Sequence, residues 1–204
     1  MSLRPLLLVL LVAGLGCDFH GDPLMIEPEH SDTASFEAGL GDWIPFGIDL
    51  LSPPVAWEVA RSTDRASDGT QAIRVRLNNL NGRGKVVLER KYAVAKDQLY
   101  TVVISFDFAT ADFGDIGLWR ILAGASPDSP TRSNSVAPRE STGNGLAADG
   151  GYRWLPKSYT MEARSDAKGE MFVHVGVWGT SEVLRTYYID KLEVTLTRKG
   201  LSAP

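Results

Sequence analysis

The residues best suited to binding chemistry lie in Glu170–Trp178, with the sequence EMFVHVGVW. Apolar and mixed residues alternate along this stretch, and a period of two predicts a β-strand with two different faces. One face carries Met171 and three valines, and the other carries Phe172, His174, Gly176 and Trp178. Sugar binding uses flat aromatic rings together with polar groups that fix the hydroxyls. A concave binding face and packing beneath a long loop both fit this pattern.

Two further aromatic residues could complete such a binding face. We predict a ligand platform formed by Trp178, His174, Trp119 and Tyr152. Trp119 is followed directly by Arg120, and adjacent strand residues point to opposite faces, so only one of these two can reach the platform unless a bulge intervenes.

Two isolated acids occupy the opposite ends of the chain. Glu37 lies in Ser35–Trp43 (SFEAGLGDW), and Asp190 lies in Thr186–Thr197 (TYYIDKLEVTLT), whose second half alternates as a strand. A carboxylate among apolar neighbours needs a partner if it is buried. We therefore expect the two ends of the chain to meet, with Glu37 on the first strand and Asp190 on the last.

A catalytic site finds little support, and we predict none. His174 is the only histidine inside the expected domain, and no nucleophile elbow, HExxH or GxGxxG occurs. A less favoured alternative is a polysaccharide lyase or glycosidase, in which His174 would combine with Tyr152 or Tyr188 and an arginine.

Short alternating runs separated by turn residues recur through most of the chain. Gln71–Leu77, Lys85–Tyr92 and Leu99–Thr110 are examples, and the last should be a central strand. Trp57 is in phase with neighbouring valines, which favours a core position. The connection Gly124–Gly151 has no periodicity and predicts a long functional or mobile loop. These features predict an all-β protein, a two-sheet antiparallel β-sandwich.

Three segments together resemble the galactose-binding-like jelly-roll domains, in particular the carbohydrate-binding modules of families 4, 9 and 22. They are SFEAGLGDW, GTQAIRV (Gly69–Val75) and YYIDKLEV, and the resemblance spans Ser35 to Thr197. It implies a jelly roll, a carbohydrate ligand and a structural calcium ion that bridges the first and last strands. By position, the metal ligands would come from Glu37, Asp190 and the loop at Asp68.

The N-terminus predicts export and lipid anchoring. Arg4 precedes ten apolar residues, Leu6–Leu15, and a membrane-spanning helix needs roughly 20, so residues 1–16 fit a signal peptide. Cys17 is the only cysteine. The preceding residues resemble a bacterial lipobox, although Gly14 stands where leucine is preferred. The resemblance implies a diacylglyceryl- and palmitate-modified Cys17, and Asp18 resembles an inner-membrane retention signal. Ordinary secretion is the alternative.

The expected organisation is a signal peptide (1–16), a lipidated cysteine with a flexible tether (17–33), a sandwich domain (34–198) and a tail (199–204). The chain has 21 basic and 25 acidic residues, so removal of Arg4 leaves 20 against 25 and a net charge of −5. An acidic chain is not expected to bind nucleic acid. We predict a membrane-anchored lipoprotein of the bacterial cell envelope that binds carbohydrate. The alternative is a protein-interaction or structural module of the envelope.

Overall fold

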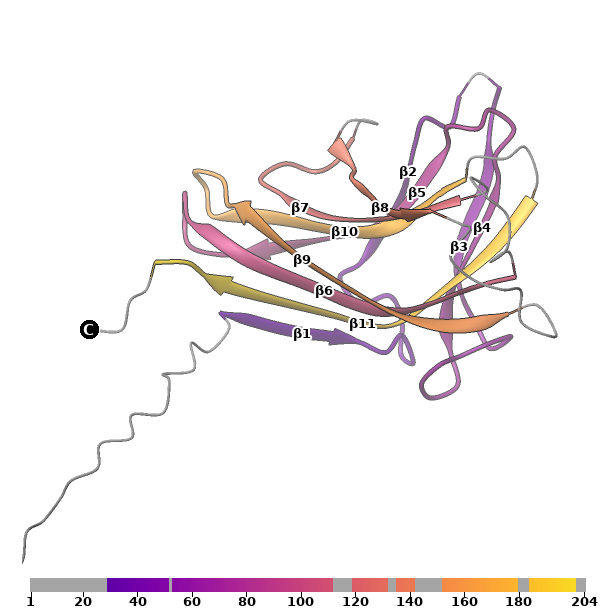
Figure 1. Ribbon diagram of the computed structural model, residues 1–204, viewed down its shortest axis with the longest axis horizontal. Helices are drawn as coiled ribbons and strands as arrows, with labels where there is room; N and C mark the ends of the chain where they lie inside the picture. The colour runs from indigo at the N-terminus through magenta and orange to yellow at the C-terminus, as the bar shows by residue number, and fades with distance from the viewer. Residues whose placement is uncertain are drawn as a thin grey trace, which may run out of the picture.

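The computed structural model describes residues 29–51, 53–111, 119–131, 135–141, 152–179 and 184–200. These residues form two antiparallel β-sheets packed face to face (Figure 1), which confirms the predicted all-β sandwich. The predicted signal peptide, Cys17 and the tether up to residue 28 lie outside the described residues. Within the part of the chain that is described, no helix has the length and hydrophobicity required to cross a bilayer.

The larger sheet has six strands, and its order is β3-β4-β11-β6-β9 with β1 paired to β11. The strands are β1 (His30–Ala34), β3 (Ala56–Ser62), β4 (Ala72–Asn78), β6 (Leu99–Thr110), β9 (Arg153–Arg164) and β11 (Leu184–Arg198). Strand β6 pairs with both β11 and β9, which confirms its predicted central position.

The two ends of the chain meet as predicted. The first half of β11 pairs with β4, and its second half pairs with β1, where Thr33 lies opposite Glu193. The pairing of β11 with β6 shifts register between Asp190 and Glu193, and Lys191 has a positive φ of 50°. This bulge kinks β11 where β4 gives way to β1 as its neighbour, and it places Asp190 at that junction.

The smaller sheet has five strands in the order β2-β5-β10-β7-β8. They are β2 (Ile44–Ile48), β5 (Lys85–Ala93), β7 (Trp119–Ser126), β8 (Pro138–Ser141) and β10 (Glu170–Gly179). The long strands of the larger sheet curve around this smaller sheet (Figure 1). Its outer face, away from the larger sheet, is the face that the sequence analysis considered for binding.

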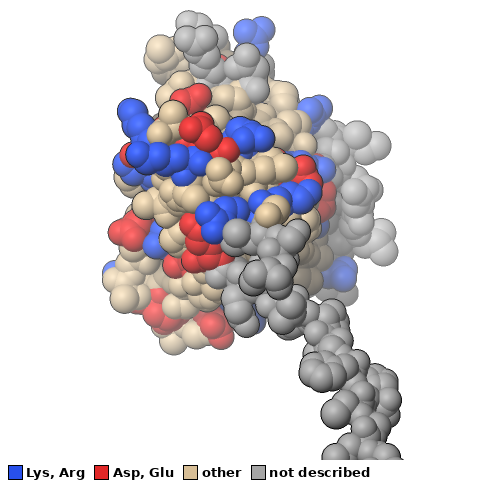
Figure 2. All heavy atoms as spheres, turned by 90° about the vertical axis from the view of Figure 1, so that its left-hand side faces the viewer, with Lys and Arg blue, Asp and Glu red and all other residues tan. Residues whose placement is uncertain are grey.

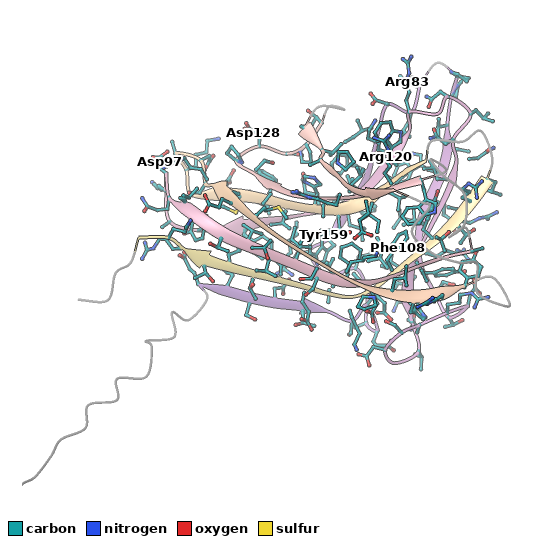
Figure 3. All side chains as sticks on the ribbon, viewed as in Figure 1. Arg83, Asp97, Phe108, Arg120, Asp128 and Tyr159 are labelled. Carbon is teal, nitrogen blue, oxygen red and sulfur yellow. The ribbon has the colours of Figure 1, made fainter. Side chains whose placement is uncertain are left out.

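The core lies between the sheets and follows the predicted alternation. Met171 and the three valines of β10 are 0% exposed, and they pack against the in-phase residues of β6 and β11, such as Ile104 and Val194. Figure 3 shows Phe108 and Tyr159 between the two sheets, whereas Arg120 points away from them. Strand parity therefore decides which side chains are available to a ligand.

Three sequence-based boundaries were wrong. β1 begins at His30, inside the expected tether, because a polar edge strand can pair with β11 while exposing alternate residues. Ser35–Trp43 is a connection rather than the first strand, and positive φ values at Phe36 (61°) and Gly41 (58°) turn the chain there. The long connection after Gly124 contains the strand β8.

Charges of both signs are interspersed on the end of the sandwich that Figure 2 shows. Elsewhere in the described residues, Lys91 pairs with Glu170 at 2.9 Å and Lys199 pairs with Glu162, so these basic side chains have acidic neighbours. This face therefore offers no concentrated positive field of the kind that attracts nucleic acid.

Candidate functional site

Trp178 stands on the outer face of the smaller sheet between two basic side chains. The strand register places it beside Lys85 on β5 and Arg120 on β7. The Lys85 ammonium and the Arg120 guanidinium each lie 4.6 Å from the centre of the indole ring, within cation–π range. The indole Nε1 donates a hydrogen bond to the Gly82 carbonyl oxygen at 3.1 Å. Contacts from both neighbouring strands and one turn therefore hold this half-buried ring.

Lys85 is 2% exposed and is fixed by two acceptors at 2.7 Å, the Asp49 carboxylate and the Arg83 carbonyl. Asp49 and Arg83 also line an open cavity of about 620 Å³ together with Gly47, Leu50 and Leu51. The volume falls within the usual range for ligand pockets. Lys85 thus links Trp178 to two residues of the cavity wall, although the indole ring itself does not line the cavity.

Arg120 is the member of this site that the sequence analysis missed. Its side chain is partly exposed, and its Nε is buried without a hydrogen-bond partner among the described residues. Adjacent strand residues point to opposite faces, as expected, but Arg120 rather than Trp119 lies with Trp178. Trp119 is 3% exposed and packs in the core with its ring 5.1 Å from that of Phe108, so its prediction as a platform residue was wrong.

His174 shares the outer face with Trp178 but is only 2% exposed. Its ring occupies the space above Gly124, where a Cβ atom would lie 2.6 Å from His174 Cε1. Neither ring nitrogen has a hydrogen-bond partner among the described residues. Burial, with a smaller contribution from Arg139, lowers the pKa of His174 to about 4. The imidazole is therefore neutral at physiological pH.

Part of this face is covered rather than open. Val136, from the connection between β7 and β8, forms a small cluster with Ile48, Val87 and Leu122 on the outer side of the smaller sheet. Ser129 of the same connection donates a hydrogen bond to Glu89 at 2.7 Å. Phe46 and Trp178 pack against the same cluster. Both alternatives left open by the sequence therefore hold in part: His174 is buried, and Trp178 and Arg120 stay partly exposed.

Tyr152 lies on the other side of the sandwich. Its ring meets the ring of Tyr188 at 5.4 Å, and the Arg65 guanidinium lies 4.1 Å from its centre. Tyr188 alternates with the core residues Tyr187 and Ile189, so this cluster occupies the outer face of the larger sheet. Of the four predicted platform residues, only Trp178 and His174 share a face. A catalytic group of His174 with Tyr152 or Tyr188 does not form, because the core separates them.

The two predicted metal-binding acids both hold the loop at residues 67–71. Asp190 is 0% exposed, and its Oδ2 accepts hydrogen bonds from Ser67 N at 2.8 Å, Ser67 Oγ at 3.1 Å and Asp68 N at 3.0 Å. Glu37 Oε1 accepts from the amides of Thr70 at 2.9 Å and Gln71 at 2.8 Å. Backbone amides thus partner both carboxylates.

The hydrogen bonds of Glu37 and Asp190 also decide whether the two carboxylates can bind a calcium ion. Hydrogen bonds from Gln71 and Thr70 hold the pKa of the Glu37 carboxyl below its ordinary value, so Glu37 is ionised. Asp190 Oδ1 and Glu37 Oε2 each accept one hydrogen bond and keep lone pairs for a cation. Asp68 is exposed, and the described residues contain no group of three or more His, Cys, Asp or Glu arranged around a metal position. A cation here would depend on carbonyl oxygens for most of its ligands.

No protein-family model and no curated protein matches the chain. Among solved structures, the tandem CBM22-1–CBM22-2 domain of Xyn10C from Paenibacillus barcinonensis is similar, with a TM-score of 0.50 and 13% identity over 90% of this chain and 49% of that chain. The two share the β-sandwich fold. The K2 cleaved adhesin domain of Lys-gingipain has a TM-score of 0.49 and 15% identity, with coverages of 81% and 97%. TmCBM61, solved with β-1,4-galactotriose, has a TM-score of 0.44 and 18% identity, with coverages of 81% and 94%.

The similarity to the tandem domain supports the predicted β-sandwich fold. At 13% identity it concerns the fold alone, and the ligand has to be argued from this chain's own residues.

Proposed function

We propose that the sandwich is a non-catalytic carbohydrate-binding module whose ligand lies against Trp178 and Arg120 on the outer face of the smaller sheet. The observation that carries the proposal is the indole ring of Trp178, held between Arg120 and Lys85. Lys85 in turn binds Asp49 and Arg83, which line a cavity of about 620 Å³. An aromatic ring in a fixed orientation gives a sugar an apolar surface at low entropic cost.

The polar groups around the ring suit hydroxyl recognition. Lys85 is neutralised by Asp49, whereas Arg120 keeps an unpartnered donor. A sugar would stack on the Arg120 side of the indole by displacing the guanidinium, which can then donate hydrogen bonds to the ring hydroxyls.

Replacement of Trp178 by alanine should weaken glycan binding at least about tenfold, equivalent to about 1.4 kcal/mol, because the stacking surface is lost. The measurement is calorimetric titration of the Cys17→Ala chain with cellohexaose, xylohexaose and β-1,4-galactotriose. Arg120→Ala should weaken binding without disturbing the indole's contact with Lys85. A wild-type chain that binds none of the three probes contradicts the proposal and favours the protein-interaction alternative.

Trp154 provides the matched control for the Trp178 variant. It is half-buried on the outer face of the opposite sheet, where its ring lies 6.4 Å from that of Tyr188. Trp154→Ala removes the same ring from the other side of the sandwich and should leave binding at Trp178 unchanged. Equal losses in both variants would indicate a general defect in folding and would remove support for the Trp178 face.

The absence of catalysis belongs to the same proposal. A general acid or base must reach hydrogen-bond distance of its substrate, and the burial of His174, which is 2% exposed, argues against that role. Its position across the core from Tyr152 and Tyr188 argues against the lyase alternative.

We also propose a structural calcium ion held by Asp190 and Glu37, with carbonyl oxygens completing its coordination. Support comes from the free lone pairs on one oxygen of each carboxylate. Hard oxygen ligands of this kind favour calcium over transition metals. The exposed Asp68 side chain is the weakest member of the predicted ligand set.

We further propose that Cys17 is lipidated and anchors the module to a membrane of the bacterial envelope, with inner-membrane retention through Asp18. The support is the sequence of the N-terminus alone. Cells grown with labelled palmitate should incorporate the label into the wild-type chain and not into Cys17→Ala. A wild-type chain without label would contradict the anchor and favour ordinary secretion.

A further inference from the structure

Two short connections meet at one end of the sandwich, and each leads from one sheet to the other. One joins β2 to β3, and the other, residues 79–84, joins β4 to β5. Figure 3 shows Arg83, from the second connection, at this end of the molecule. The cavity of about 620 Å³ is lined by Asp49, Leu50 and Leu51 from the first connection and by Arg83 from the second. The relative position of the two connections therefore sets the shape of the cavity.

The side chain of Asn81 joins the two connections. Its Nδ2 donates to backbone carbonyl oxygens of the first connection, at 2.9 Å from Asp49, 3.2 Å from Leu51 and 3.4 Å from Pro53. Its Oδ1 accepts a hydrogen bond from the backbone amide of Arg83 at 2.8 Å. Asn81 does not line the cavity itself, yet it is bonded to the backbone of residues from both connections that do.

The surroundings of Asn81 require a neutral amide. Its Oδ1 faces backbone N–H donors, including that of Gly84 at 3.0 Å, and its Nδ2 faces backbone carbonyl oxygens. An asparagine side chain carries donors at one end and an acceptor at the other, so it satisfies both. A carboxylate of the same size would set a charged oxygen against the carbonyl oxygens. Gly82 completes the turn with a positive φ of 65°, which glycine adopts without strain.

The connection that Asn81 fixes also holds the residues at the centre of the proposed glycan site. The carbonyl oxygen of Gly82 accepts the hydrogen bond from the indole Nε1 of Trp178 at 3.1 Å. The carbonyl oxygen of Arg83 accepts one from Lys85 Nζ at 2.7 Å, and this ammonium lies against the same indole. The orientation of the indole therefore depends on where residues 81–83 lie.

A second asparagine, Asn79, fixes the start of the connection from inside the fold. It is 1% exposed, and its Nδ2 donates to the carbonyl oxygen of Gly179, the residue that follows Trp178. Its Oδ1 accepts from the amide of Gly84 at 2.9 Å. Asn79 thus belongs to the buried structure, whereas Asn81 is partly exposed and can be replaced without opening the core.

We propose that Asn81 is the positioning residue of the glycan site, which sets the separation of the cavity walls and the orientation of the Trp178 indole. It acts through Gly82, Arg83 and the first connection, and it makes no contact with the ligand. Groups held in their bound arrangement lose little entropy on binding, so a loosened connection lowers affinity although every binding residue remains. The effect on a glycan rests on the proposed function, whereas the effect on the indole can be measured without a ligand.

Asn81→Asp is the test, because it keeps the size of the side chain and replaces the amide donor by a charged oxygen. We would label the Cys17→Ala chain with ¹⁵N and assign its five indole signals with phenylalanine variants. In the ligand-free chain, Asn81→Asp should move the Trp178 signal and leave the Trp154 signal in place. Calorimetric titration with cellohexaose, xylohexaose and β-1,4-galactotriose should show at least about fivefold weaker binding, which corresponds to the loss of roughly one hydrogen bond.

Leu80→Ala is the matched control in the same connection. Leu80 is 44% exposed and does not line the cavity, so this variant should leave the Trp178 signal and the affinity unchanged. Asn81→Ala removes the amide without adding a charge, and it should move the Trp178 signal and weaken binding as Asn81→Asp does.

The outcomes separate the positioning role from the proposed function. A Trp178 signal that stays fixed in both Asn81 variants overturns the positioning role, and so does a signal that moves while binding stays as tight as in the wild-type chain. Displacement of all the indole signals together would make Asn81 a requirement of the whole fold and would also overturn the local role. A wild-type chain that binds none of the probes, while Asn81→Asp moves the Trp178 signal alone, contradicts the proposed function and supports the positioning of the indole.

Discussion

Replacement of Asp190 by alanine should lower the free energy of unfolding by about 3 kcal/mol or more. The carboxylate is 0% exposed and accepts hydrogen bonds from Ser67 N, Ser67 Oγ, Asp68 N and Lys191 N. Each buried donor left without a partner costs about 1–3 kcal/mol. The loss releases the 67–71 loop from β11 at the bulge, and urea unfolding followed by fluorescence measures it.

Glu193→Ala is the control on the same strand. Glu193 is exposed, so this variant removes the same charge and should change stability by no more than about 0.5 kcal/mol. An Asp190→Ala chain as stable as Glu193→Ala would contradict the role given to the buried carboxylate.

The same pair of variants separates the loop contacts from calcium. Calcium should raise the melting temperature of the wild-type chain above its value in EDTA, and Asp190→Ala should abolish that rise. A wild-type chain that melts identically in calcium and EDTA contradicts the calcium proposal. The destabilisation by Asp190→Ala would remain, because it follows from the amide hydrogen bonds alone.

The strands and their faces were predictable because alternation is a local property. The residues of β6 and β10 face the sides that the alternation assigns to them. Parity does not say which face is covered. That depends on segments distant in the sequence, such as the one carrying Val136, which packs with Ile48 and Val87 on the outer face of the smaller sheet.

Trp57 illustrates the second limit. Its phase with Val55 and Val59 indicates a core position, and its side chain does point to the inner side of the sheet, as that of its partner Leu77 does. It is nevertheless 36% exposed because β3 is the last strand of its sheet. Whether a strand lies at an edge is a property of topology, which the local pattern does not encode.

Arg120 shows that strand alternation alone does not say which of two adjacent residues faces outward. The sequence established that Trp119 and Arg120 face opposite ways. Because an aromatic ring was expected at the binding face, Trp119 rather than Arg120 was assigned to that face, which was wrong. The packing of Trp119 on Phe108 supplies the reference, since a ring of this size contributes more to the core than an arginine can.

Acidification from pH 7.5 to pH 5 should destabilise the protein through His174 by about 2 kcal/mol. Burial lowers the pKa of His174 to about 4, whereas an unfolded histidine titrates near 6.5. Between these values the unfolded state binds the proton and the folded state does not, so stability falls as the pH falls through this window. Urea unfolding at a series of pH values measures the slope.

His174→Gln isolates this effect from the carboxylates. Glu37, Asp64 and Asp166 also have lowered pKa values, and their contributions are lost only as the pH falls through their ordinary range near 4. Those losses occur equally in the variant, so the difference in slope between the two proteins belongs to His174. Parallel stability curves between pH 5 and 7.5 would contradict burial of a neutral imidazole. They would imply that water reaches the His174 ring on the face that it shares with Trp178.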